Sequence, residues 1–277
     1  MYTDGAARRA IRRRVRTWYL ASKRDLPWRR TRDPYAVLVS EVMLQQTQVA
    51  RVIPAYRAFL KRFPTLRSLA RSSLGDVVRQ WSGLGYNRRA RDLHRIACSV
   101  PGALPRDVDG LDALPGIGPY TAGAVSCFAH GERVPFADTN VRRVLGRVVL
   151  GRIASEREAV AIDAELMPRD AASWHHALMD IGATVCTART PRCEACPLAP
   201  SCRGRGRLGS EPRRSQPSFA TSDRRVRGWI VTLLRERDMT ADSLSRAIDD
   251  PRVPRLVEAL VSEGMVERSG ATVRLPK

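Results

Sequence analysis

Four cysteines stand close together in this chain and could hold a metal centre. They are Cys186, Cys193, Cys196 and Cys202, with the spacing C-x6-C-x2-C-x5-C. Four thiolates on one loop can ligate a [4Fe–4S] cube, although this spacing is neither of the common ferredoxin patterns. A zinc site usually brings two close pairs of ligands, and a disulfide pair is a further alternative. The spacing therefore leaves an iron–sulfur cluster, a zinc ion and a disulfide open.

A glycine-rich turn precedes the cysteines. The segment Leu-Pro-Gly-Ile-Gly ends at Gly118, and Pro119 is expected to open the next helix. Gly116 and Gly118 let the backbone turn tightly and expose amide hydrogens at a helix N-terminus. Such amides suit a DNA phosphate, whereas a plain helix–helix turn is the alternative reading.

The charge of the chain points to a polyanionic partner. Lysine and arginine number 48 against 28 acidic residues, a formal net charge of +20 in 277 residues. Such an excess of base is typical of proteins that bind nucleic acid. A membrane surface is the other polyanion, but no basic amphipathic segment or spanning apolar run supports it. No signal-peptide core follows the N-terminal arginines, so we expect a cytoplasmic, nucleoid-associated protein whose thiols stay reduced.

Helical patterns dominate the elements that must position these residues. A helix is expected to start at Asp33-Pro34, and an apolar stripe from Val49 to Phe63 predicts another. Further helices are expected at about 65–71, 74–81, 86–99, 107–113, 119–129, 139–150, 155–167 and 171–184. The predicted fold class is therefore all-α.

The C-terminal part of the sequence predicts a separate small module. A first domain spans 1–202, with the cysteine loop at 186–202, and 203–222 has the composition of a flexible basic linker. In the predicted module, 223–277, three short helices at about 224–236, 242–248 and 252–263 precede a hairpin at 266–275. This order is typical of a winged helix.

Several segments now identify a family resemblance. Besides the glycine turn and the cysteine loop, the chain contains Leu-Pro-Trp-Arg at 26–29, Ser-Glu-Val-Met-Leu-Gln-Gln-Thr-Gln-Val at 40–49, Gly-Leu-Gly-Tyr at 83–86 and Met-Asp-Ile-Gly-Ala at 179–183. Together they resemble the helix-hairpin-helix DNA glycosylases of the endonuclease III and MutY group over roughly residues 12 to 202. The details are similar to MutY-type adenine DNA glycosylases.

The resemblance implies a fold, a cofactor and a reaction. The fold is bilobal, with double-stranded DNA held across the cleft between the lobes, and the four cysteines hold one [4Fe–4S] cluster. The reaction is base excision repair of adenine mispaired with 8-oxoguanine or guanine, by a monomer. Cleavage of the N-glycosidic bond needs one acid to protonate the leaving base and one carboxylate for the sugar cation.

The catalytic roles follow from the same resemblance. Glu41 is the expected general acid, because burial on its apolar helix would raise its pKa. Asp138 is the expected carboxylate as well as a helix N-cap, and Asn140 is expected to orient it or the sugar. Tyr120 stands where bifunctional relatives carry a lysine that forms a Schiff base, so we expect hydrolysis without strand cleavage.

Other residues are expected to contact DNA after the adenine leaves the helix. Gln45 or Gln46 and Tyr86 would fill the duplex, while Trp28, Leu44 and Asp180 would line the adenine pocket. The remaining expected contacts come from the motifs themselves: Arg29, Gly116 and Gly118.

Two other functions stay open at this point. Glycosylases of the same fold that remove thymine or uracil also carry a tyrosine near this position, although a pyrimidine needs no acid such as Glu41. A non-enzymatic iron–sulfur DNA-binding protein would have no use for Glu41 and Asp138. Full-length relatives carry a larger C-terminal β domain that reads 8-oxoguanine, so we expect weaker selectivity for 8-oxoguanine here.

Overall fold

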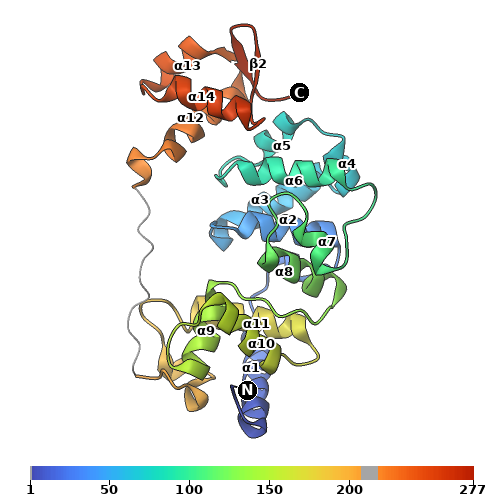
Figure 1. Cartoon of the computed structure of the whole chain (residues 1–277), viewed down its shortest axis with the longest axis vertical. Helices are drawn as coiled ribbons and strands as arrows, with labels where there is room; N and C mark the ends of the chain where they lie inside the picture. Colours follow the sequence, from blue (N-terminus) through green and yellow to red (C-terminus); the bar gives the residue numbers. More distant parts are fainter. Residues whose placement is uncertain (1, 207–217) are drawn as a thin grey trace. The chain divides into compact units, whose positions relative to one another are not determined.

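The computed structural model describes residues 2–206 and 218–277 of the chain. Its helical elements follow one another in Figure 1 in the order that the sequence predicts. Two compact units are present, and each combines several stretches of chain. The first unit contains residues up to 37, 105–113 and those from 117 to the end of the cysteine loop. The second contains 38–104, 114–116 and the C-terminal residues.

The first unit is built from helices with well-formed N-caps. Asp4 caps α1 (Gly5–Ser22), Ser155 forms a capping box with α10 (Glu156–Leu166), and Asp170 caps α11 (Ala171–Thr184). The unit also contains η1 (Pro27–Arg29), α7 (Val108–Asp112), α8 (Pro119–His130), α9 (Thr139–Leu150), η2 (Cys193–Ala195) and η3 (Ala199–Ser201).

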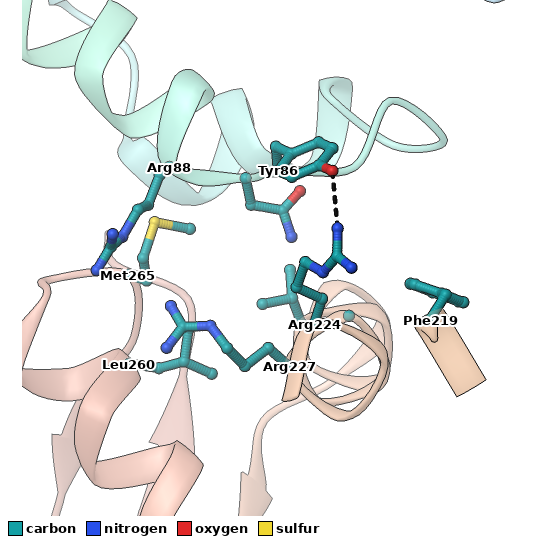
Figure 2. Close-up of a pocket in the computed structure, with 10 residues that line it drawn as sticks. Tyr86, Arg88, Phe219, Arg224, Arg227, Leu260 and Met265 are labelled. Atoms are coloured by element: carbon teal, nitrogen blue, oxygen red, sulfur yellow. Dashed lines mark hydrogen bonds between the residues drawn. The ribbon is translucent and has the colours of Figure 1, made fainter. Parts of the chain in front are cut away.

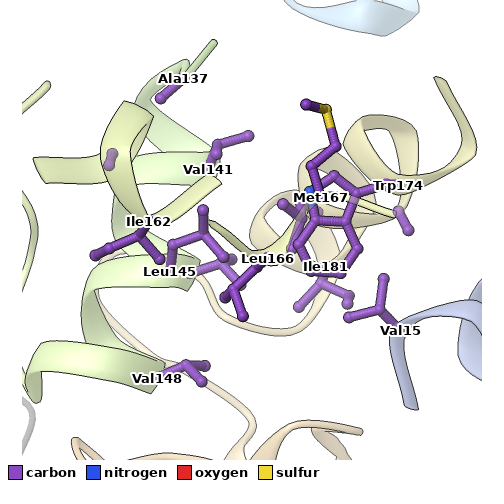
Figure 3. Close-up of a cluster of buried hydrophobic side chains, with 14 of the residues drawn as sticks. Val15, Ala137, Val141, Leu145, Val148, Ile162, Leu166, Met167, Trp174 and Ile181 are labelled. Carbon is purple, nitrogen blue, oxygen red and sulfur yellow. The ribbon is translucent and has the colours of Figure 1, made fainter. Parts of the chain in front are cut away.

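A buried apolar cluster holds these helices together. In Figure 3, side chains of α9 face those of α10 and α11, and Val15 adds α1 to the cluster. Helix α9 approaches α11 closely at Gly182, where an added Cβ would lie 2.5 Å from the Cβ of Asn140. A larger residue at this position would therefore push away the helix that carries the candidate site.

The second unit contains the helices around the middle of the sequence. Helix α2 (Pro34–Leu44) begins in the first unit and continues in the second. It is followed by α3 (Val49–Arg62), α4 (Leu66–Ala70), α5 (Leu74–Gln80) and α6 (Arg88–Ser99). The Phe59 ring packs edge-on against Phe63 and Trp81, with centroids 5.0 and 5.8 Å away, and all three are fully buried.

The C-terminal residues add helices and a small sheet to the second unit. After η4 (Phe219–Thr221) come α12 (Asp223–Glu236), β1 (Met239–Thr240), α13 (Ala241–Ile248), α14 (Val253–Ser262), β2 (Glu267–Ser269) and β3 (Thr272–Arg274). The sheet has the antiparallel order β1-β3-β2, with Val273 opposite both Met239 and Arg268. The helices and the hairpin lie where the sequence predicts them, β1 was not foreseen, and the winged-helix assignment stays a prediction.

This C-terminal region packs on helix α5 of its own unit. The amide of Gly75 donates to the carbonyl of Pro276 at 2.8 Å, and Arg235 Nε donates to the carbonyl of Val78 at 3.1 Å. An added Cβ on Gly75 would lie 2.6 Å from that same Pro276 oxygen. Part of the predicted linker, residues 207–217, lies outside the described residues.

Candidate functional site

Asp138 caps helix α9 and has both carboxylate oxygens engaged. Its Oδ1 accepts from the backbone amide of Val141 at 2.7 Å, and its Oδ2 accepts from Nδ2 of Asn140 at 2.8 Å. The predicted cap is therefore confirmed, and Asn140 lies where it can orient this carboxylate.

Asn140 is in turn held by a buried arginine. Nη2 of Arg143 donates to Oδ1 of Asn140 at 2.7 Å and to the carbonyl of Gly182 at 2.8 Å. Nε of Arg143 donates to the carbonyl of Cys186 at 2.7 Å. A continuous set of hydrogen bonds therefore links the Asp138 carboxylate to helix α11 and to the first residue of the cysteine loop.

The segment before Asp138 is fixed by a second buried network. Oδ2 of Asp163 accepts from the amide of Phe136 at 3.2 Å and lies 2.7 Å from Nε2 of His175, while Oδ1 accepts from Trp174 Nε1 at 2.7 Å. The Phe136 ring stacks on His175 with centroids 3.9 Å apart. Asp163 and His175 are fully buried, so they fix the backbone that presents Asp138.

Tyr120 lies in the first turn of α8, after the glycine turn. Its ring packs edge-on against Phe136, with centroids 5.6 Å apart, and it is partly exposed. Because Phe136 precedes Asp138 by two residues, the structure brings Tyr120 near the segment that carries the carboxylate. The chain has three lysines, Lys23, Lys61 and Lys277. None of them lies in the hairpin.

Glu41 occupies a buried position on helix α2, as the sequence predicts. It is 6% exposed, and its neighbours Ser40, Val42 and Met43 are also buried. Glu41 belongs to the second unit and Asp138 to the first.

Two exposed turns in the second unit carry the residues predicted to enter the duplex. Gln46 follows the end of α2, and Tyr86 ends the Gly-Leu-Gly-Tyr segment. Both have left-handed backbones, with φ of 56° and 47°, which is uncommon for residues other than glycine. Gly83 and Gly85 also have positive φ, at 81° and 71°. Strained conformations of this kind are often found at ligand-binding sites.

Arg89 joins these two turns, and its role was not predicted from the sequence. Its side chain is buried, and its guanidinium lies 5.5 Å from the centroids of Trp81 and Tyr86. Burial lowers the pKa of Arg89 to about 10, which still leaves it a cation at neutral pH. The sequence did hint that Arg89 is buried. It shares one face of α6 with Leu93 and Ile96, which are apolar.

The glycines of the turn before α8 have different environments. Gly116 has a positive φ of 72°, and an added Cβ would lie 2.9 Å from Oδ2 of Asp92. Gly118 caps α8 without a side chain, and a Cβ there would meet nothing within 4 Å. Gly116 is thus required by the turn itself, whereas Gly118 leaves the amides at the start of α8 open to a ligand.

Asp180 is paired with two arginines in the interior of its unit. Asp180 is fully buried, and its Oδ1 accepts from Arg24 Nε at 2.5 Å and from Arg29 Nη2 at 2.9 Å. Its Oδ2 accepts from Arg29 Nη1 at 2.7 Å and from the Arg24 amide at 3.1 Å. Both oxygens are therefore hydrogen-bonded to arginine, and the expected contact of Asp180 with the adenine amine stays a prediction. Arg29 is likewise hydrogen-bonded to Asp180, and Trp28 beside it is buried, so the expected contacts of both residues with DNA stay predictions.

The four cysteines of the loop surround one small apolar cavity of about 20 Å³. Nη1 of Arg147, a buried residue of α9, lies 3.4 Å from the sulfur of Cys186 and offers a positive charge to a thiolate. Burial raises the pKa of Cys196 to about 11 and that of Cys202 in the same direction, so metal binding must displace these protons. Among the described residues, no set of three or more His, Cys, Asp or Glu side chains is arranged for a single metal ion.

A cavity of about 470 Å³ opens beside Tyr86 in the second unit (Figure 2). Nη1 of Arg224 donates to the Tyr86 hydroxyl at 3.0 Å, and the exposed ring of Phe219 lies at the same cavity. Apolar side chains of Leu260 and Met265 also line it. The C-terminal region therefore extends the surface around one of the two exposed turns.

Comparison with known proteins decides the family. Residues 39–169 match the model of the HhH-GPD superfamily of base excision DNA repair proteins. An adenine DNA glycosylase of Mycolicibacterium smegmatis is 44% identical over 271 residues, which cover 91% of each chain. The chain belongs to the adenine DNA glycosylase family. The adenine DNA glycosylase of Homo sapiens is 40% identical over 76% of this chain and 42% of the human protein.

Solved structures support the same assignment of fold. A thermostable thymine-DNA glycosylase superposes with a TM-score of 0.66 and 27% identity, covering 72% of this chain and 96% of that one. A trapped endonuclease III–DNA covalent intermediate gives a TM-score of 0.60 and 27% identity over 71% of this chain and 96% of that one. The predicted helix-hairpin-helix glycosylase fold is confirmed.

Family membership also resolves the chemistry of the cysteine loop. Residues 186–202 match the iron-sulfur binding domain of endonuclease III. The chain therefore binds a [4Fe–4S] cluster in the segment that contains Cys186, Cys193, Cys196 and Cys202, and the zinc and disulfide alternatives are set aside. Their shared cavity and the guanidinium of Arg147 fit a negatively charged cluster with its thiolates. In this family member, the cluster loop is joined to the Asp138 side chain through Arg143 and Asn140.

Proposed function

We propose that this protein excises adenine mispaired with 8-oxoguanine or guanine in double-stranded DNA. The observation that carries the proposal is the 44% identity to an adenine DNA glycosylase over 91% of both chains. The buried Glu41 and the doubly hydrogen-bonded Asp138 supply the two carboxyl groups that the reaction needs. Adenine leaves with a proton from Glu41 as the bond between C1′ of the deoxyribose and N9 breaks. Water adds to C1′, and the proton that it gives up replaces the one lost from Glu41.

Glu41 and Asp138 have different roles in the reaction. Glu41 protonates a ring nitrogen of adenine, which makes the base a better leaving group. The Asp138 carboxylate stabilises the sugar cation that forms as the bond breaks. Asn140 keeps that carboxylate in place, and Tyr120 packs against the same segment through Phe136.

Hydrolysis without strand cleavage follows from the side chain at position 120. A lyase reaction requires an amine that forms a Schiff base with C1′ of the sugar, and tyrosine has none. The chain contains only three lysines, none of them in the hairpin. Sodium borohydride should therefore trap no protein–DNA adduct, and strands should break only after hot alkali.

Extrusion of the adenine requires that other groups fill the duplex. The turn residues Gln45 and Gln46 and the Tyr86 ring supply these groups, and Trp28 of the first unit and Leu44 of the second each serve to bind the flipped base. The amides after Gly116 and at Gly118 bind a phosphate of the DNA backbone. The net charge of +20 adds salt-sensitive binding to any sequence.

The cellular setting is proposed on the same basis. We place the enzyme on nucleoid DNA in the cytoplasm, acting as a monomer. In the part of the chain that the structure describes, no helix combines the length and apolarity that a membrane span requires.

The substitution Glu41→Gln tests the assignment of the general acid. It should lower the excision rate by about 10²–10⁴-fold, because the leaving base loses its proton donor, while DNA binding stays close to wild type. An excision rate near wild type would show that another group protonates the base.

Thymine or uracil excision opposite guanine is the second candidate, favoured by the likeness to a thymine-DNA glycosylase at a TM-score of 0.66. A pyrimidine can leave as an anion, so that reaction gives Glu41 no role. The burial of Glu41 on α2 favours adenine.

A further inference from the structure

The two exposed turns of the second unit are connected to each other through side chains and not only through the core. Oγ1 of Thr47 donates to the carbonyl of Leu84 at 3.4 Å, and Arg51 of α3 donates to the carbonyl of Gly83. These contacts join the turn that carries Gln46 to the turn that carries Tyr86.

Arg89 makes the central connection. Nη1 of its guanidinium binds the end of α2 and the turn that carries Gln46. Nη2 binds Thr47 and the turn that carries Tyr86. Nη1 donates to the carbonyls of Val42 at 2.9 Å, Met43 at 2.9 Å and Gln45 at 2.6 Å. Nη2 donates to Oγ1 of Thr47 at 3.0 Å and to the carbonyls of Leu84 at 3.2 Å and Gly85 at 3.1 Å.

We propose that Arg89 is a positioning residue that holds the turns of Gln46 and Tyr86 as one rigid wedge, so that both side chains enter the duplex together. This inference rests on the proposed function, because it concerns extrusion of the adenine. Gln46 and Tyr86 both have left-handed backbones, and such conformations persist only where surrounding contacts hold them. A planar guanidinium can bind acceptors on two sides at once.

A lysine at position 89 could not make these contacts with both turns. Its ammonium is a compact point charge with three donors, whereas the guanidinium presents five donors in a fixed plane. Arg89→Lys therefore keeps the charge and most of the apolar stem but loses simultaneous contact with both turns. The carbonyls of Val42 and Met43 belong to the helix of Glu41, so a purely structural role of Arg89 would also disturb the acid.

The test compares adenine in a paired duplex with adenine in an unpaired bubble, for wild type and Arg89→Lys. A wedge is needed only where the adenine is stacked and paired. Arg89→Lys should slow excision from the duplex by about 10- to 100-fold, the scale expected for a misplaced group. Excision from the bubble, where the base is already free, should stay within about twofold of wild type.

A second readout does not depend on excision. A duplex with the fluorescent purine 2-aminopurine beside the mispaired adenine reports unstacking when the wedge enters. Wild type should raise its fluorescence on binding, and Arg89→Lys should give a smaller rise at saturating protein. Wild type that raises the fluorescence but excises no adenine would contradict the proposed function alone and leave the inference about Arg89 standing.

Two further variants complete the design. Thr47→Val removes the hydroxyl link between the turns at nearly constant volume, and should change both readouts in the same direction if Arg89→Lys does not fold. Arg12→Lys is the matched control, because Arg12 also binds backbone carbonyls, those of Leu166 and Met167, in the first unit. Equal losses on duplex and bubble, or no change in either readout, would overturn the inference.

Discussion

Asn140 donates from Nδ2 to Asp138 at 2.8 Å and accepts at Oδ1 from Arg143 at 2.7 Å. The amide is thus oriented from both ends, since its nitrogen faces a carboxylate and its oxygen faces a guanidinium. Because Arg143 also binds the carbonyl of Cys186 at 2.7 Å, the position of the carboxylate depends on the loop that holds the cluster.

Asn140→Ala should lower the single-turnover rate of adenine excision by about 10- to 100-fold, because the Asp138 carboxylate loses one of its two donors. Affinity for mispaired DNA should change little. Thr139→Ala is the control, because Thr139 stands next to Asn140 but its side chain does not donate to Asp138. Equal rates for Asn140→Ala and wild type would show that the Val141 amide alone holds the carboxylate.

Asp180→Asn should destabilise the protein, because Asp180 pairs with Arg24 and Arg29 in the interior. It leaves the guanidinium of Arg29 buried without its counter-charge, and the free energy of unfolding should fall by about 3 kcal/mol in urea titrations. Asp25→Asn is the control, because Asp25 pairs with Arg30 on the surface and should change stability by less than about 1 kcal/mol. A stable Asp180→Asn protein with altered base preference would show that Asp180 acts on the substrate and not on stability.

Cys196→Ser should remove iron from the protein. Wild type should contain about four iron atoms per chain and show a broad absorption in the visible range, as one [4Fe–4S] cluster requires. The variant should lose iron together with folding stability or DNA affinity, while Cys98→Ser, an exposed cysteine outside the loop, should keep both. One zinc and no iron in wild type would reverse the assignment.

Selectivity between the two mispairs tests the C-terminal region. We expect adenine opposite guanine to be excised at a rate not far below adenine opposite 8-oxoguanine, because the net charge of +20 supplies binding that does not depend on the opposing base. Deletion of the residues after Ser222 should reduce affinity more than it changes this ratio. A large preference that disappears on deletion, or in Arg224→Ala, would identify the cavity beside Tyr86 as the reader of 8-oxoguanine.

The sequence predicted those parts of the site that depend on local patterns. Asp138 could be placed at a helix N-cap and Glu41 in a buried helix, because capping and apolar spacing are visible within a few residues. The cysteine spacing marked the loop as a candidate metal site, and the family resemblance pointed to the cluster. Each of these features is fixed by neighbours along the chain.

Residues whose partners lie far away in sequence were harder to interpret. Asp180 was expected to face the substrate because nothing near it shows that Arg24 and Arg29 occupy both its oxygens. Arg89 was overlooked because it stands among other arginines that resemble a solvated helix face. Its acceptors belong to residues 42–47 and 84–85, which come together only in the folded unit.

The most direct measurement of the central claim is single-turnover excision on four duplexes that differ only in one pair. They contain A opposite 8-oxoguanine, A opposite G, T opposite G and U opposite G, with hot alkali used to reveal the abasic product. The proposed function predicts excision from both adenine duplexes and none from the other two. Excision from the T or U duplexes, with both adenine duplexes left intact, would contradict it.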